Sequence, residues 1–165
     1  MELKEAFKTA IKGEIEGREL YRTAAEKTTD KKAKKNFALL ADEEQKHLDA
    51  LLKLAQEYNE GKELTIPSLP APTSFQDAES PIFTKEFKET IANKDFEMST
   101  LSIGIKLEIE SEKFYREMAK MATGPDLKKF FEYLADWEKG HYEYLSKQIS
   151  FFENYYRTKY SMARF

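Results

Sequence analysis

Apolar residues recur along most of the chain at the spacing of 3.6 residues per turn that is typical of amphipathic α-helices. This spacing predicts a first helix over residues 2–28. A second helix should follow Asp30, which is a good N-cap, and end near Glu60. A third should span residues 95–123, and Pro125 suits the first position of a fourth. The pattern therefore predicts an all-α protein.

Residues 62–82 break this pattern and contain four of the five prolines in the chain. Proline disrupts helices and favours extended backbone. We therefore expect residues 61–94 to form a long crossover, with one short helix near residues 84–92. Two short links and one long crossover are typical of a ferritin-like four-helix bundle. A chain of 165 residues suits a single domain over residues 1–165.

The two predicted helix pairs resemble each other at an offset of 94 residues. Between residues 11–53 and 105–147, about 19 of 43 aligned positions are identical without a gap. Two unrelated amphipathic helices would share their apolar spacing, but not this many polar residues. The sequence therefore predicts two similar helical hairpins, over about residues 1–60 and 95–154, related by pseudo-two-fold symmetry.

The only two histidines of the chain lie in the same short motif, Glu-x-x-His. Glu44 and His47 form the first copy, and Glu138 and His141 form the second copy 94 residues later. Residues three apart lie on one face of a helix. In both helices that face otherwise carries the apolar stripe. We therefore expect all four side chains in the core of the bundle.

A glutamate also interrupts the apolar stripe of each remaining helix, at Glu14 and Glu108. Buried ionised carboxylates are unfavourable and repel one another, unless cations neutralise them. Oxygen and imidazole donors without sulfur suit iron or manganese. One glutamate from each of two helices, with Glu-x-x-His from each of the others, is the ligand pattern of ferritin-like two-metal proteins. The predicted metal ligands are Glu14, Glu44, His47, Glu108, Glu138 and His141.

Other repeated residues lie close to these ligands. Tyr21 and Tyr115 follow Glu14 and Glu108 by two turns. Their hydroxyl groups could either be satisfied within the core or orient a ligand carboxylate by hydrogen bonding. Glu112, one turn after Glu108, is a further possible ligand.

The remaining repeated acidic residues are weaker candidates. Glu16 and Glu110 follow the ligand positions by two residues. They point about 200° away from the stripe and are expected in solvent. Asp42 and Asp136 also lie off the predicted ligand face.

The composition excludes several classes of protein. The chain has no cysteine, and therefore no disulfide, thiolate zinc site or iron–sulfur cluster. A net charge of −3 gives no reason to expect nucleic-acid binding. Without a long apolar segment or a signal-peptide core, we expect no membrane span and a cytoplasmic location.

These motifs resemble those of rubrerythrin-like proteins of the erythrin type, within the ferritin-like di-iron carboxylate superfamily. The resemblance covers most of the chain. It implies two iron ions, with manganese or a mixed pair as alternatives, and a site that reduces hydrogen peroxide or dioxygen. The matching segments are Glu14 to Tyr21, Leu40 to His47, Glu108 to Tyr115 and Leu134 to His141.

The chain also departs from rubrerythrin in two respects. Rubrerythrin carries a cysteine-ligated rubredoxin module, which a chain without cysteine lacks, so an external electron donor such as a rubredoxin is implied. Its further glutamate, one turn after the Glu108 position, is involved in redox-linked metal movement, and here that place is Ser111. The aromatic C-terminal segment is expected to form a helical extension over residues 155–165. We expect it to cover the bundle or form a subunit interface, as in a homodimer. Domain-swapped dimers occur among relatives.

Three other functions remain open from the sequence. One is ferroxidase activity with iron storage, and another is a structural bundle that keeps a vestigial site. The third is an oxygenase-like activity.

Overall fold

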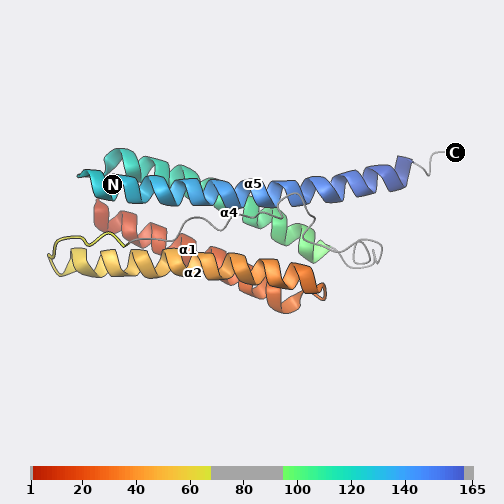
Figure 1. Ribbon diagram of the computed structural model, residues 1–165, viewed down its shortest axis with the longest axis horizontal. Coiled ribbons are helices and arrows are strands. Elements are labelled where there is room, and N and C mark those ends of the chain that lie inside the picture. Colours follow the sequence, from red (N-terminus) through yellow and green to blue (C-terminus); the bar gives the residue numbers. More distant parts are fainter. Residues whose placement is uncertain (1, 68–94, 162–165) are drawn as a thin grey trace.

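The computed structural model describes residues 2–67 and 95–161. Helices dominate this part of the chain, and their bounds lie within a few residues of those predicted, which confirms the all-α four-helix architecture (Figure 1). The helices are α1 (Leu3–Lys27), α2 (Lys31–Asn59), α4 (Asp95–Met121) and α5 (Pro125–Ser161). The short helix predicted near residues 84–92 lies outside the described residues, as do residues 162–165 of the predicted extension. That the chain forms one domain stays a prediction.

Local sequence explains where α2 begins and ends. The Asp30 carboxylate accepts a hydrogen bond of 2.8 Å from the backbone N–H of Ala33, as expected of an N-cap. At the other end Gly61 has a φ of 66°, a left-handed conformation that glycine adopts without strain. The backbone N–H of Lys62 then bonds to the carbonyl of Glu57 at 2.9 Å, which closes a Schellman motif.

The helices form two antiparallel pairs, α1 with α2 and α4 with α5, and α1 also packs against α4 (Figure 1). The colour gradient shows that α2 and α4 run in the same direction. The pairs correspond to the two predicted hairpins. At 37 residues, α5 is much longer than the 25-residue α1 and continues to Ser161, so residues 155–161 of the predicted extension are helical.

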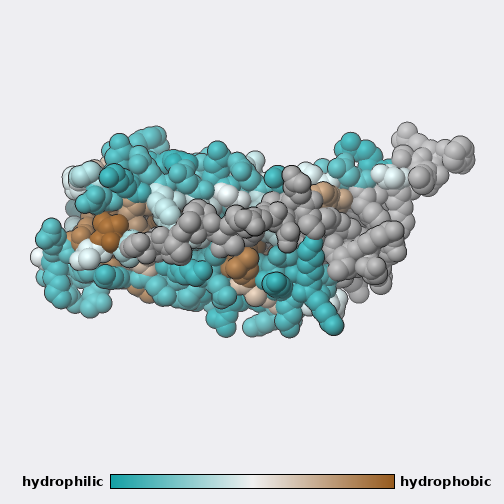
Figure 2. Space-filling model, in the orientation of Figure 1, coloured by the Kyte–Doolittle hydropathy of each residue, from teal (hydrophilic) through white to brown (hydrophobic). Residues whose placement is uncertain are grey.

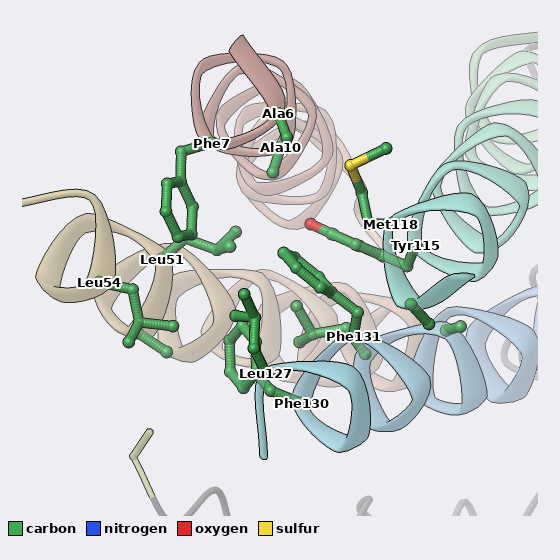
Figure 3. Packing of buried hydrophobic residues seen from close by; sticks show 14 residues of the cluster. Ala6, Phe7, Ala10, Leu51, Leu54, Tyr115, Met118, Leu127, Phe130 and Phe131 are labelled. Carbon is green, nitrogen blue, oxygen red and sulfur yellow. The ribbon is translucent and has the colours of Figure 1, made fainter. Parts of the chain in front are cut away.

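Two apolar clusters fill the bundle, one toward each end. The first includes Phe7, Leu51, Tyr115 and Phe131 (Figure 3). The second includes Tyr21, Phe37, Leu101 and Leu145. In every helix the predicted metal ligands lie between the residues of these two clusters. The core therefore consists of an apolar cluster toward each end and a polar centre between them.

The outer surface has a different character. In Figure 2 the visible face of the described helices is mostly hydrophilic, with apolar residues in small groups. None of the described helices is both long and apolar enough to cross a membrane.

Candidate metal centre

All six predicted ligands are buried at the centre of the bundle. Their exposed fractions lie between 0% for the two histidines and 3% for Glu44 and Glu108. The hairpin of α1 and α2 contributes Glu14, Glu44 and His47, and the hairpin of α4 and α5 contributes Glu108, Glu138 and His141.

These side chains form two overlapping groups. The first consists of Glu14, Glu44, His47 and Glu138. The second consists of Glu44, Glu108, Glu138 and His141. Within each group, one ligand atom from every residue lies within 4.8 Å of the others. Since Glu44 and Glu138 belong to both groups, they are placed to bridge two neighbouring metal ions. Each group then has one glutamate and one histidine of its own.

Both histidines direct Nδ1 toward the carboxylates. His47 Nδ1 lies 3.3 Å from an oxygen of Glu14 and 3.3 Å from an oxygen of Glu138. His141 Nδ1 lies 3.1 Å from Glu44 and 3.5 Å from Glu108. The centroids of the two rings are 6.2 Å apart. The arrangement therefore follows the pseudo-two-fold symmetry of the repeat.

The two repeated tyrosines hydrogen-bond to the glutamates that are not shared. Tyr21 of α1 donates to Oε1 of Glu108 on α4, and Tyr115 of α4 donates to Oε1 of Glu14 on α1. Both rings are also buried in the apolar clusters, so each tyrosine packs in the core and hydrogen-bonds to a predicted ligand. Each tyrosine thus holds a carboxylate of the opposite hairpin.

Burial and neighbouring charges shift the pKa values of the residues in the cluster. Burial raises the pKa of Glu44 well above its ordinary value, and neighbouring carboxylates raise it further. Burial likewise raises the pKa of Glu108 to about 8. Burial alone would lower the pKa of His47, but the carboxylates of Glu14 and Glu138 raise it to about 9. In the absence of metal, the cluster therefore retains protons that the same groups would lose in water.

Unsatisfied polar atoms indicate that the cluster suits cations. Glu14 Oε2, His47 Nδ1 and Glu138 Oε1 are buried, and none has a hydrogen-bond partner in the described part of the chain. Such atoms are unfavourable unless something binds them. Oxygen and imidazole donors in this number fit two divalent ions of the iron or manganese type. The residues present therefore fit a two-metal centre.

The other predicted acidic residues lie away from these groups. Glu112 is half-buried and faces Arg116 at 3.5 Å, so it is not brought to the centre. Glu16 and Glu110 are exposed, as expected, and pair with lysines on their own helices. Asp42 and Asp136 are exposed as well.

Sequence reasoning did not single out Glu43 and Trp137, two buried residues next to the ligands. Glu43 Oε2 lies 2.7 Å from His141 Nε2, and the indole N–H of Trp137 donates to the same oxygen at 3.1 Å. A signal was available in the sequence. Glu43 lies three residues after Leu40 and four before His47, and this spacing places it on the core face of α2.

Small residues stand one turn after each unshared glutamate. A Cβ atom on Gly17 would lie 3.4 Å from the Glu44 carboxylate, so this part of α1 closely approaches a shared ligand. At the equivalent place on α4, Ser111 is half-buried and lines a cavity of about 320 Å³ between α1 and α4. Gly13 and Tyr115 line the same cavity. The cavity thus reaches the tyrosine that holds Glu14.

Comparison with known proteins identifies the family of the chain. A model of the rubrerythrin family matches residues 5–149. Among solved structures, a hypothetical protein from Pyrococcus furiosus, Pfu-1136390-001, is similar, with 27% sequence identity and a TM-score of 0.67. The match covers 94% of this chain and 92% of that one. A search of curated proteins finds no match. By its fold and by this family match over most of its length, the chain belongs to the rubrerythrin family.

Proposed function

We propose that the protein is a di-iron carboxylate enzyme that reduces hydrogen peroxide, or dioxygen, with electrons from an external donor. The observation that carries this proposal is the pair of overlapping ligand groups that share Glu44 and Glu138. Two ions held by groups that share ligands would lie side by side in a buried site, which suits a reaction that needs two electrons at one place. Two ferrous ions would supply those electrons, which with two protons convert one hydrogen peroxide molecule into two of water.

The residues of the chain have distinct parts in this function. Glu44 and Glu138 would bridge the ions, while each histidine would bind one ion through Nδ1. Tyr21 and Tyr115 fix one oxygen each of Glu108 and Glu14, so the other oxygen stays directed at the centre. This is a common way in which neighbouring groups orient metal ligands.

The cavity beside Ser111 supports the proposal that the substrate is a small oxidant. It lies between α1 and α4 and is lined by Gly13, Ser111 and Tyr115. Its volume of about 320 Å³ admits small molecules such as peroxide or dioxygen. Because Tyr115 lines the cavity and donates to Glu14, one side chain separates a molecule in this cavity from the ligand group.

An external donor is supported by an aromatic path to the surface. The Trp137 ring lies edge-on to His47, with centroids 4.9 Å apart, and contacts Tyr133 at 5.2 Å. Tyr133 in turn lines a surface pocket of about 500 Å³ with Leu64 and Ile66. A donor bound over this pocket would therefore be three aromatic rings from the metal centre. The cytoplasmic location and the homodimer stay predictions.

Metal analysis of the purified protein, followed by peroxide titration of its reduced form, tests the proposal. We expect two iron ions per chain and rapid oxidation of both by one equivalent of hydrogen peroxide, followed by absorbance under anaerobic conditions. A parallel titration with dioxygen identifies the better oxidant. Glu138→Gln, which alters both ligand groups, is the matched negative control. A protein that binds no transition metal, or a reduced iron form indifferent to both oxidants, would contradict the proposal.

A further inference from the structure

The repeat is broken beside the metal centre by one pair of residues that face each other. Glu43 on α2 and Trp137 on α5 are 94 residues apart, so they occupy equivalent places in the two halves. Both are buried, and the Trp137 Nε1–H group donates to Glu43 Oε2 at 3.1 Å. An acid in one half thus corresponds to an indole in the other.

This pair gives His141 an acidic partner. Nδ1 of His141 faces the ligand carboxylates. The lone pair needed to bind a metal is therefore on Nδ1, and the proton is on Nε2. The Nε2–H group then donates to Glu43 Oε2, which lies 2.7 Å away. A carboxylate that accepts from a histidine ligand fixes the ring and strengthens the electron donation of its other nitrogen to the metal.

His47 has no equivalent carboxylate. The repeat would place one at the position of Trp137, and the indole ring is found there, 4.9 Å from the imidazole and nearly perpendicular to it at 88°. An indole N–H can only donate, and this one lies 3.1 Å from Glu43 Oε2 and 3.0 Å from His141 Nε2, so it accepts nothing from His47. His47 Nε2 accordingly has no hydrogen-bond partner among residues 2–67 and 95–161.

The other contacts of the two ligand groups are balanced. Each group contains the shared carboxylates of Glu44 and Glu138, one further glutamate and one histidine. Each further glutamate accepts a hydrogen bond from a tyrosine of the opposite hairpin. The difference between Glu43 and Trp137 is therefore one that acts on the two histidines.

We propose that the two metal positions are unequal, and that Glu43 makes the position of Glu108 and His141 the tighter one, which is loaded first. The inference rests on the proposed two-metal function and deepens it. Glu43 acts here as a positioning residue through His141. His47, which has Trp137 in place of a carboxylate partner, binds the second ion more weakly.

Titration of the metal-free protein with Co²⁺ tests this inference without any turnover. Calorimetry should resolve two binding steps of different affinity, and the visible absorption of cobalt should change in shape between the first and second equivalents. Glu43→Gln keeps the size of the side chain but removes its charge. We expect it to weaken the first step by about 10- to 100-fold, so that the two steps approach each other. Asp42→Asn, an exposed change of charge one residue away, should alter neither step.

Two histidine variants identify the position that fills first. With one equivalent of Co²⁺, His47→Ala should keep the affinity of the first wild-type step, and His141→Ala should show only the weaker one. Circular dichroism of each metal-free variant checks that it is folded.

Equal affinities in the wild type, or equal effects of the two histidine variants, would overturn the inference while leaving the two-metal function intact. An unchanged first step in folded Glu43→Gln would overturn it as well. A wild-type protein that binds no Co²⁺ would overturn both the inference and the proposed function.

Discussion

The hydroxyl group of Tyr115 on α4 donates a hydrogen bond to Oε1 of Glu14 on α1, across the interface between the two hairpins. Figure 3 shows the ring among the apolar residues of its cluster, with the hydroxyl group directed toward α1. Tyr21 and Glu108 repeat this contact in the opposite direction. One residue type therefore contributes to the apolar core and to the orientation of the site.

Removal of either hydroxyl group should weaken metal binding. In Tyr115→Phe the Glu14 carboxylate loses its buried donor, and we expect metal affinity to fall by about tenfold, as for other groups that orient ligands. Tyr21→Phe should have a similar effect through Glu108. Affinity is measured by competition with a chelator. Tyr58→Phe, at a ring that is 40% exposed, is the control and should bind as the wild type does. Unchanged affinity in both buried variants would exclude the orienting role.

Replacement of two glycines by alanine should change the stability of the fold in opposite directions. A Cβ atom on Gly104 would lie 2.9 Å from the Tyr21 hydroxyl oxygen and 3.1 Å from Leu145 Cδ1. We expect Gly104→Ala to destabilise the fold by about 1–3 kcal/mol. A Cβ atom on Gly140 would meet nothing within 4 Å, so Gly140→Ala should stabilise its helix by about 0.5–1 kcal/mol. Urea unfolding of the metal-free proteins measures both, and effects of the same sign would contradict the packing described.

The stability of the metal-free protein should fall as the pH rises from 6 to 9. Folding raises the pKa of His47 from 6.5 to about 9, so its contribution is complete below pH 6.5 and is lost as the pH rises through 9. Folding also raises the pKa of Glu108, from 4.5 to about 8, and its contribution is lost over that interval. Burial would raise the pKa of Glu138, but its neighbours in the cluster lower it below 4.5. Its contribution is therefore constant above pH 4.5 and is lost only at lower pH.

Urea midpoints at pH 6 and pH 9 measure this dependence. The metal-loaded protein should show a smaller difference, because bound cations replace the protons. Glu108→Gln should reduce the difference in the metal-free protein. A midpoint that rises with pH would contradict the prediction.

The shared and unshared glutamates should differ in metal stoichiometry. Glu138→Gln affects both ligand groups, so we expect it to abolish stable binding of both ions. Glu14→Gln affects one group and should leave one ion per chain. Bound metal is counted after loading and gel filtration, with the exposed Glu16→Gln as a control that keeps both ions. Two ions retained by Glu138→Gln would show that this residue does not bridge.

The sequence predicted the helices and the clustering of the six residues because these depend on repeated local patterns. Glu14 and His47 stand where an apolar stripe requires a core residue, and each has a counterpart 94 residues later. Burial follows from that position alone. The same polar residues at core positions in both halves are not expected by chance.

Partners across the interface could not be predicted in the same way. Tyr21 lies on the same helix as Glu14, yet it binds Glu108, because that choice depends on how the hairpins pack. Glu112 lies one turn after Glu108, but four residues turn a helix by 400°, about 40° past the ligand direction, and Arg116 binds it there. Glu43 was not singled out because its counterpart is a tryptophan and the repeat therefore gave no signal.

The two tyrosine hydrogen bonds have a consequence for how such a centre is assembled. A single hairpin holds three of the six ligands, and its tyrosine binds a glutamate that it does not contain. Only two copies could assemble the centre, and identical copies would give identical halves. In one polypeptide that contains both hairpins, position 43 can carry an acid while position 137 carries an indole. Two hairpins joined in a single chain can therefore differ from each other, as the halves of a symmetric pair of identical chains cannot.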